Sequence, residues 1–212
     1  MATPMQEQIA ELRDVLERQS IRRGHFTLAS GATSNFYCNT KATTLSPRGA
    51  RLTGEILFEL LKDRGVEAVG GLAMGATFIA TAVALVSDQR GQPIYGFTVR
   101  SQQKTHGLET SIEESWHPDG KPLLSPGRRV AVVEDVITQG GSVLKAIDAV
   151  QARGCEIALV DRGAGGAEKL RARGMDYVSL FRADHQGKLE ANDLSSSPHE
   201  PEPPHGLGQL RS

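Results

Sequence analysis

The feature that most constrains the fold of this chain is an alternation of continuous apolar segments with segments of helical periodicity. The apolar segments are Ala68–Leu72, Ile94–Val99, Val130–Val133, Ile157–Val160 and Tyr177–Phe181, and the helical ones are Phe78–Gln89, Ser142–Arg153 and Glu168–Arg173. A strand that is apolar at every position is typical of a sheet covered by helices on both faces. The sequence therefore predicts an α/β fold with a five-stranded, mostly parallel sheet flanked by helices.

The first part of the chain predicts one helix and two strands. Residues Met5–Gln19 carry apolar side chains at helical spacing, which predicts a helix with one buried face. These side chains are Ile9, Leu12, Val15 and Leu16. Two short strands are expected around Phe26 and Phe36, with a glycine turn between them, and a further helix is expected to start at Pro47.

The length of the chain, 212 residues, is enough for one well-buried domain and short for two. We expect the N-terminal helix and strands over residues 1–45, a core over residues 46–190 and a tail over residues 191–212. From Leu194 onward the sequence is rich in proline and poor in apolar residues. Because burial there cannot offset the entropy of ordering, the tail is predicted to be disordered.

Composition excludes several classes of protein. The formal net charge is −1, so a nucleic-acid-binding surface is not expected. No apolar run approaches the roughly 20 residues that cross a bilayer, and the N-terminus lacks the pattern of a signal peptide. Cys38 and Cys155 lie far apart, and no histidine has metal-ligand spacing, so no protein metal centre is expected. These observations predict a cytoplasmic protein without membrane partners.

Two adjacent carboxylates end the third apolar segment, in the stretch VAVVEDVITQGGS. In an open parallel sheet, ligands bind at the carboxyl ends of the strands. The N–H groups of the loop Val136–Gly141 and of the following helix's first turn are expected to converge on a phosphate. Thr138 and Ser142 can add hydroxyl donors, whereas Glu134 and Asp135 suit sugar hydroxyls or a bridging magnesium ion. A ribose 5-phosphate satisfies both halves of the motif.

A polar stretch, VRSQQKTHGLETSIEES, follows the second apolar segment and has no apolar periodicity, which predicts a mobile loop. Arg100, Lys104 and His106 make its first half cationic, and three glutamates make its second half acidic. Such a loop can fold over a diphosphate, neutralise the charge on the leaving group and exclude water.

Both segments also have an interpretation without a ligand. The acids and glycines could form a solvent-facing turn followed by a flexible linker, and the charged loop could be only a solvated surface. The position of the two carboxylates, directly after an apolar strand and before a glycine pair, favours the ligand site over the turn.

The stretch VVEDVITQGGS resembles the phosphoribosyl-diphosphate motif of the type I phosphoribosyltransferases. The segments GHFTLASG, GGLAMGATFIATAVAL, VRSQQKTHG and LVDRGAGGAEKL resemble, in order and spacing, the orotate branch of that family. The resemblance implies the type I phosphoribosyltransferase fold with a small N-terminal hood. It implies transfer of 5-phosphoribosyl from phosphoribosyl diphosphate to orotate, which gives orotidine 5'-phosphate for UMP synthesis. It also implies Mg²⁺, brought in with the diphosphate.

The resemblance implies roles for individual residues as well. Lys104 and Asp135 are the implied catalytic residues, and Thr138 and Arg162 are the implied orotate ligands, because a guanidinium fork fits a carboxylate. The implied ligands of phosphoribosyl diphosphate are Ala73, Met74, Gly75, Arg100, Ser101, Lys104, His106, Glu134, Asp135, Val136, Ile137, Thr138, Gln139, Gly140, Gly141 and Ser142. The family further implies a homodimer in which the Arg100–Glu114 loop reaches the neighbouring site. Phe36 and Tyr37 are candidates for the apolar lining of the hood, although one aromatic pair near a turn is more often plain core.

The chain departs from the family pattern at positions where many relatives carry a lysine. These positions are Ala29, Ala32, Thr33 and Ser101. Lys41 and Arg22 are the candidates to replace a missing charge. Two other functions use the same motifs: transfer to a different nucleobase, and regulation by a protein that binds the diphosphate without transfer. The second generally needs a nucleic-acid-binding surface, which the charge balance does not predict.

Overall fold

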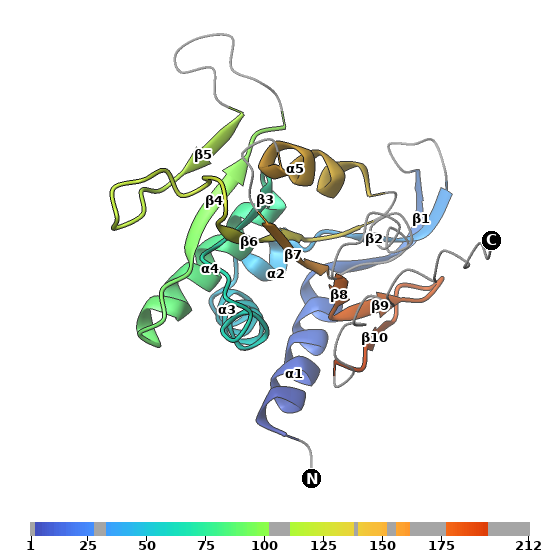
Figure 1. Ribbon diagram of the computed structural model, residues 1–212. Coiled ribbons are helices and arrows are strands. Elements are labelled where there is room, and N and C mark those ends of the chain that lie inside the picture. Colours follow the sequence, from blue (N-terminus) through green and yellow to red (C-terminus); the bar gives the residue numbers. More distant parts are fainter. Residues whose placement is uncertain are drawn as a thin grey trace, which may run out of the picture.

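The protein is built around a six-stranded sheet with the strand order β5-β4-β3-β6-β7-β8 (Figure 1). The computed structural model describes residues 3–27, 33–101, 111–137, 140–151, 156–161 and 177–194. The strands of this sheet are β3 (Ala68–Leu72), β4 (Tyr95–Val99), β5 (Ile112–Glu114), β6 (Arg129–Glu134), β7 (Glu156–Asp161) and β8 (Tyr177–Ser179). All neighbours are parallel except β5, which runs antiparallel to β4. The predicted α/β class with a mostly parallel sheet is confirmed, but the sheet of the described residues has six strands and not the predicted five.

The prediction of a mobile loop is wrong at Ile112–Glu114, which form the edge strand β5. The polar stretch was expected to remain a loop to its end, but Ile112–Glu114 pairs with β4, with Ile112 opposite Val99. Ile112 is 4% exposed and packs into the core. A single apolar residue among glutamates gives no alternation over the length of a strand, so the sequence pattern misses it.

The last predicted strand, Tyr177–Phe181, is also corrected, because it is divided between two sheets. Its first part is β8, whereas Phe181 begins β9 (Phe181–Ala183), which pairs antiparallel with β10 (Leu189–Ala191). Leu180 and Phe181 are both buried, so the apolar run continues through the point where the chain leaves the large sheet.

Five helices accompany the strands within the described residues: α1 (Pro4–Gln19), α2 (Lys41–Thr44), α3 (Pro47–Leu61), α4 (Gly75–Gln89) and α5 (Gly141–Gln151). α4 begins three residues before its predicted start at Phe78, because its first turn is made of small residues that give no periodic signal. α2 is too short for any periodicity and was not expected. The predicted helix over Glu168–Arg173 lies outside the described residues.

The hairpin of β1 (Ile21–Thr27) and β2 (Thr33–Cys38) confirms the two short strands expected near the N-terminus. The strands are antiparallel and form a sheet of their own, beside the large one (Figure 1). Phe26 and Tyr37 face each other across the hairpin, with their ring centroids 5.8 Å apart.

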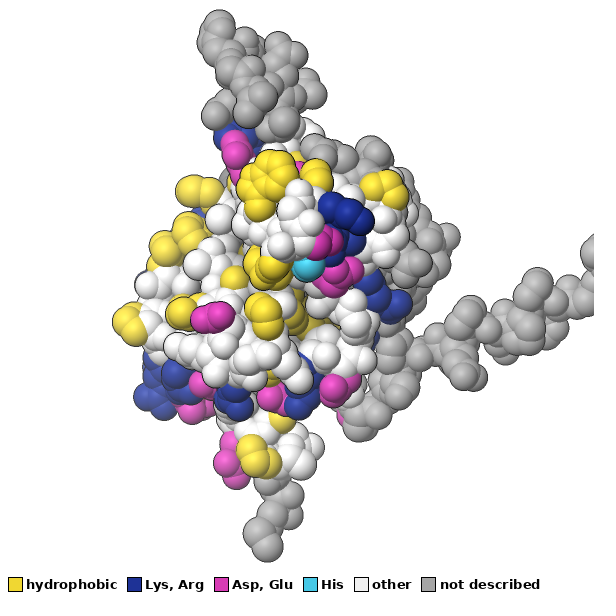
Figure 2. Space-filling view, turned by 60° about the vertical axis from the view of Figure 1, so that its left-hand side comes forward, with side chains coloured by type: hydrophobic (Ala, Val, Ile, Leu, Met, Phe, Trp, Pro, Cys, Tyr) yellow, Lys and Arg dark blue, Asp and Glu magenta, His cyan; other side chains and the backbone are white. Residues whose placement is uncertain are grey.

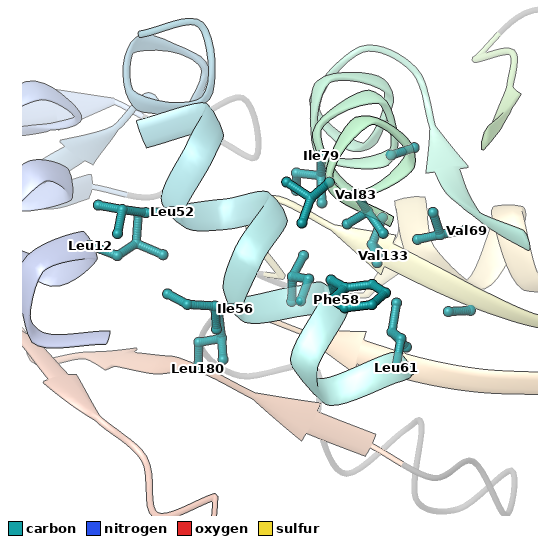
Figure 3. Packing of buried hydrophobic residues seen from close by; sticks show 14 of the residues in the cluster. Leu12, Leu52, Ile56, Phe58, Leu61, Val69, Ile79, Val83, Val133 and Leu180 are labelled. Carbon is teal, nitrogen blue, oxygen red and sulfur yellow. The ribbon is translucent and has the colours of Figure 1, made fainter. Parts of the chain in front are cut away.

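Two apolar layers cover the faces of the large sheet. Val69, Ala131 and Val133 pack with the buried faces of α1, α3 and α4 on one side (Figure 3). The residues that alternate with them, Val130 and Val132 among them, pack with α5 on the other side. Strand side chains alternate between faces, so burial on both sides explains the continuous apolar runs in the sequence.

The N-terminal helix shares its core with the rest of the domain. Leu12 and Leu16 are at most 1% exposed and belong to the same cluster as Leu52 and Ile56 of α3 and Leu180 (Figure 3). Thr3 closes a capping box at the start of α1, which satisfies two N–H groups of the first turn. α1 is therefore held by packing along its length and by hydrogen bonds at its start.

A charged network holds the segment between β5 and β6. Arg128, 8% exposed, donates one guanidinium N–H to Glu67 and another to Asp119. The backbone N–H of Lys121 donates to Asp119 Oδ1 at 3.0 Å. That hydrogen bond, with smaller contributions from His117 and Arg128, lowers the pKa of Asp119 to about 2. In this segment Trp116 remains exposed, and nothing in the structure explains its exposure.

No helix among the described residues combines the length and the apolar composition that crossing a bilayer requires.

We predict that Leu12→Ala lowers the free energy of unfolding by about 2–5 kcal/mol, because it leaves a cavity in the shared core. Leu45→Ala is the matched control: Leu45 is 63% exposed, and the change should cost less than about 0.5 kcal/mol. Urea denaturation followed by circular dichroism measures both. Equal losses for the two variants would contradict the integration of α1 into the core.

Candidate functional site

The carboxyl ends of three neighbouring strands meet at the candidate site. β3 lies between β4 and β6, and the loop Ala73–Gly75 follows it directly. The Ala73 N–H donates to the Val99 carbonyl at the end of β4, at 2.7 Å. On the other side Gly75 lies against Asp135, which follows β6. A Cβ built on Gly75 would lie only 2.3 Å from Asp135 Cγ. The loop therefore contacts the ends of both neighbouring strands.

The two motif acids occupy different environments. Glu134, 7% exposed, is the last residue of β6, and its Oε1 accepts the Asp135 N–H at 3.2 Å. Asp135 is half-buried, its Oδ1 accepts the Val136 N–H at 3.1 Å, and its Oδ2 accepts the Thr40 hydroxyl. Asp135 is thus fixed in orientation, at the edge of the site.

The loop after the acids is anchored at one end and open at the other. Ile137 is 1% exposed and packs with Val143 of α5. Gly140 has a φ of 78°, a left-handed conformation that favours glycine. Gly141 and Ser142 are exposed at the start of α5, where the first N–H groups of a helix have no intrahelical acceptor. This arrangement can bind an anion. Thr138 and Gln139 lie outside the described residues.

The end of β4 carries a cation that is already paired. Arg100 forms an ion pair with Glu113 of β5, and its backbone N–H donates to the Ser111 carbonyl at 2.7 Å. Its buried Nε has no hydrogen-bond partner, so the guanidinium keeps a donor for a further acceptor. Lys104 and His106, predicted as its partners, lie outside the described residues.

Lys145 brings a second cation to this edge, which no sequence motif indicated. Its ammonium, on the exposed side of α5, donates to the carbonyl of Ser101, one of the positions at which the chain departs from the family pattern. Of the two candidate substitutes, Arg22 donates to backbone carbonyls of Arg18 and Ile21, and Lys41 begins α2.

The structure separates the two predicted lining aromatics of the hood. Phe36 packs against the turn before β10: a Cβ built on Gly187 would lie 2.6 Å from its Cγ. Tyr37, 47% exposed, faces Phe26 instead. Arg162, the predicted orotate ligand, lies outside the described residues. The residue before it, Asp161, pairs in register with Glu134, so this strand end adjoins the motif acids.

The donors suit a metal that arrives with a ligand. Among the described residues, no group of three or more His, Cys, Asp and Glu side chains is placed to hold an ion. The carboxylates of Glu134 and Asp135 are hard oxygen donors of the kind Mg²⁺ prefers, and Mg²⁺ is usually held by one or two carboxylates together with phosphates and water.

Comparison with known proteins identifies the family. A sequence model of the phosphoribosyl transferase domain family matches residues 42–186. An orotate phosphoribosyltransferase of Bradyrhizobium diazoefficiens is 43% identical over 178 residues, which cover 82% of this chain and 93% of the relative. One from Rhodopseudomonas palustris is 44% identical over 178 residues, with the same coverage of both chains. The chain belongs to the orotate phosphoribosyltransferase family.

Solved structures of orotate phosphoribosyltransferases agree with this assignment. The Mycobacterium tuberculosis enzyme in complex with Fe(III) dicitrate shares 38% identity at a TM-score of 0.67, over 81% of this chain and 94% of that one. The same enzyme in complex with 5-phospho-alpha-D-ribosyl 1-diphosphate shares 36% identity at a TM-score of 0.63, over the same fractions. The type I phosphoribosyltransferase fold is thereby confirmed.

Proposed function

We propose that this protein is an orotate phosphoribosyltransferase. It transfers the 5-phosphoribosyl group of phosphoribosyl diphosphate to orotate and yields orotidine 5'-phosphate and diphosphate, a step of pyrimidine synthesis. The observation that carries the proposal is the contact between Gly75 and the Asp135 carboxylate. It joins the loop Ala73–Gly75, at the start of α4, to the acids of the phosphate motif, so a phosphate, a ribose and a diphosphate can each bind along one edge.

The substrate lies along this edge in a defined order. The 5-phosphate binds the loop Val136–Ser142, and the ribose hydroxyls bind Glu134 and Asp135. The diphosphate binds the loop Ala73–Gly75 together with Arg100, Ser101, Lys104 and His106. Orotate lies beside Thr138 and Arg162, whose guanidinium binds the carboxylate of the base.

The reaction breaks the bond between ribose C1 and the diphosphate oxygen and forms a bond between C1 and an orotate ring nitrogen. The diphosphate leaves with the bonding electron pair, so positive charge develops on the ribose and negative charge on the leaving group. The ring nitrogen of dianionic orotate is already nucleophilic, so no strong protein base is needed. Positioning and charge stabilisation, by Lys104 above all, then carry most of the rate.

Magnesium is part of the substrate in this proposal. Glu134 and Asp135 are the residues that would hold it, directly or through water, next to the diphosphate. When bound, the ion supplies positive charge that partly neutralises the leaving group.

We propose further that two copies of the chain form a homodimer, in which the Arg100–Glu114 loop serves the neighbouring site. Met74, Phe78 and Leu85 share one face of α4 by helical spacing, and Met74 and Leu85 are 62% and 61% exposed. Figure 2 shows hydrophobic side chains spread over the side of the molecule that carries α4 and β5. Such a face favours burial against a second protein surface.

The cytoplasm is the proposed location, because two widely separated cysteines do not indicate a disulfide framework.

We predict that the purified protein consumes orotate only when magnesium and phosphoribosyl diphosphate are both present. We also predict that Lys104→Ala lowers kcat at least about 100-fold, because the substitution removes charge stabilisation of the leaving group. The ultraviolet absorbance of orotate measures both. Lys62→Ala, on the far end of α3 and paired with Glu59, should leave kcat unchanged. An unaltered kcat in Lys104→Ala would refute the role of the loop, and inactivity of the parent protein would refute the proposed reaction.

Arg162→Ala should raise the KM for orotate about 30–150-fold, because a bidentate pair with a charged group is worth about 2–3 kcal/mol. Steady-state kinetics with orotate varied at saturating phosphoribosyl diphosphate measures the change. Arg90→Ala, at the exposed end of α4, is the matched control and should leave KM as it was. An unchanged KM in Arg162→Ala would point to a different base as the acceptor.

For the dimer, sedimentation velocity should give about twice the mass of one chain. Leu85→Glu places a charge in the proposed interface and should shift the protein to the monomer mass, whereas Leu45→Glu, equally exposed but outside α4, should not. A monomeric parent protein would exclude the dimer, and insensitivity to Leu85→Glu would exclude this face as the interface.

A further inference from the structure

Thr40 connects the N-terminal part of the chain to the motif acid. Its hydroxyl donates to Asp135 Oδ2, a contact between residues 95 positions apart in the sequence. Thr40 is 2% exposed, so no bulk water replaces this donor. A buried hydroxyl that donates to a carboxylate holds one rotamer of the acid in place, because other rotamers lose the hydrogen bond.

The position of Thr40 is itself fixed by its neighbours. Its carbonyl oxygen accepts the N–H groups of Thr43 and Thr44, at 2.9 and 3.0 Å, which makes it the N-cap of α2. Thr43 Oγ1 in turn lies 2.7 Å from the hydroxyl of Ser20, in a buried hydrogen bond at the end of α1. The donor of Asp135 therefore belongs to a rigid unit and not to a loop side chain.

The Asp135 carboxylate retains acceptor capacity on the side of the site. An ionised carboxylate has about four lone-pair positions, of which Thr40 and the Val136 N–H take one on each oxygen. The Gly75 backbone lies over the face of the carboxylate and takes none of these positions, since an added Cβ would be 2.3 Å from Cγ and 2.4 and 2.5 Å from the two oxygens. About two acceptor positions remain, which matches two vicinal hydroxyls of a ribose.

We propose that Thr40 is a positioning residue for the ribose: its hydroxyl sets the orientation in which Asp135 accepts the sugar hydroxyls. The inference rests on the proposed function insofar as that function places the ribose at Asp135. The proposal adds a residue from outside the phosphate motif. It also makes ribose binding depend on the contact between α2 and the end of α1, where Thr43 and Ser20 form a hydrogen bond.

The test is the affinity of the magnesium complex of phosphoribosyl diphosphate, measured by calorimetry on the full-length protein. Thr40→Val keeps the shape and removes the donor, and it should weaken binding about tenfold, the effect of one hydrogen bond to a charged group. Thr40→Ser restores the hydroxyl and should return the Kd to within about twofold of the parent value. In kinetics, the KM for phosphoribosyl diphosphate should rise in Thr40→Val while the KM for orotate stays constant.

Thr53→Val is the matched control for a buried threonine. Thr53 is 1% exposed on α3, and its hydroxyl has no hydrogen-bond partner, so the substitution should change neither Kd nor KM. In the Asp135→Ala background, Thr40→Val should have no further effect, because no side-chain oxygen remains at position 135 for Thr40 to orient. Thr40→Ala also removes the donor, and it serves as the test if Thr40→Val fails to fold.

Equal affinities for Thr40→Val and the parent, or a Thr40→Ser variant as weak as Thr40→Val, would overturn the inference. So would a full additional loss of affinity in the Asp135→Ala background. Because the readout is binding, it stays informative if the protein proves to bind the diphosphate without transfer. In that case the proposed reaction fails, and the role of Thr40 is still decided.

Discussion

The site depends on the parallel pairing of β3 with β6. Their register joins Ala68 to Val130 and Gly70 to Val132, so the two strands leave the sheet at the same level and their loops meet. Gly71 makes the approach possible: a Cβ there would lie 2.1 Å from the Val133 carbonyl and 2.8 Å from Ala76 of α4. A side chain at this position would separate β3 from β6 or lift α4, and Gly75 would lose its contact with Asp135.

The large sheet and the phosphate motif could be predicted from the sequence because both leave a local signal. A parallel strand covered on two faces must be apolar throughout, and a loop that binds phosphate needs glycines, hydroxyls and a following helix in fixed order. The strands β3, β4, β6 and β7 and the loop after Asp135 follow from those patterns. The roles of Lys104, His106, Thr138 and Arg162 stay predictions, because these residues lie outside the described part of the chain.

The parts that the sequence missed depend on contacts between distant residues. Ile112 becomes a strand residue only because Val99 lies beside it, and Lys145 reaches Ser101 only after α5 has packed on the sheet. Thr40 gave no signal, since a threonine in a short polar stretch looks like any turn residue. Such contacts arise from tertiary packing, which local patterns do not encode.

At this edge of the sheet, the Arg100 guanidinium already has a carboxylate partner, with which an anionic substrate must compete. Arg100 is matched by Glu113, one of the acidic residues in the second half of the charged stretch. A diphosphate that binds the guanidinium competes with this carboxylate, so part of its electrostatic gain is offset by the pair it disrupts. The described contact of the Lys145 ammonium is with a neutral carbonyl, so an anion that binds this ammonium displaces no carboxylate from that contact.

The packing of α1 against the last part of the domain has a consequence for biosynthesis. Glu17 accepts the Leu189 N–H at 2.8 Å across 172 residues, and Leu12 shares its cluster with Leu180 and Phe181. On the ribosome, α1 therefore cannot complete its burial until the residues around Leu180 and Leu189 have been synthesised. At ordinary elongation rates this delay is on the order of ten seconds or more, during which an apolar helix face remains available to chaperones. A chain that ends before Leu180 would never cover it.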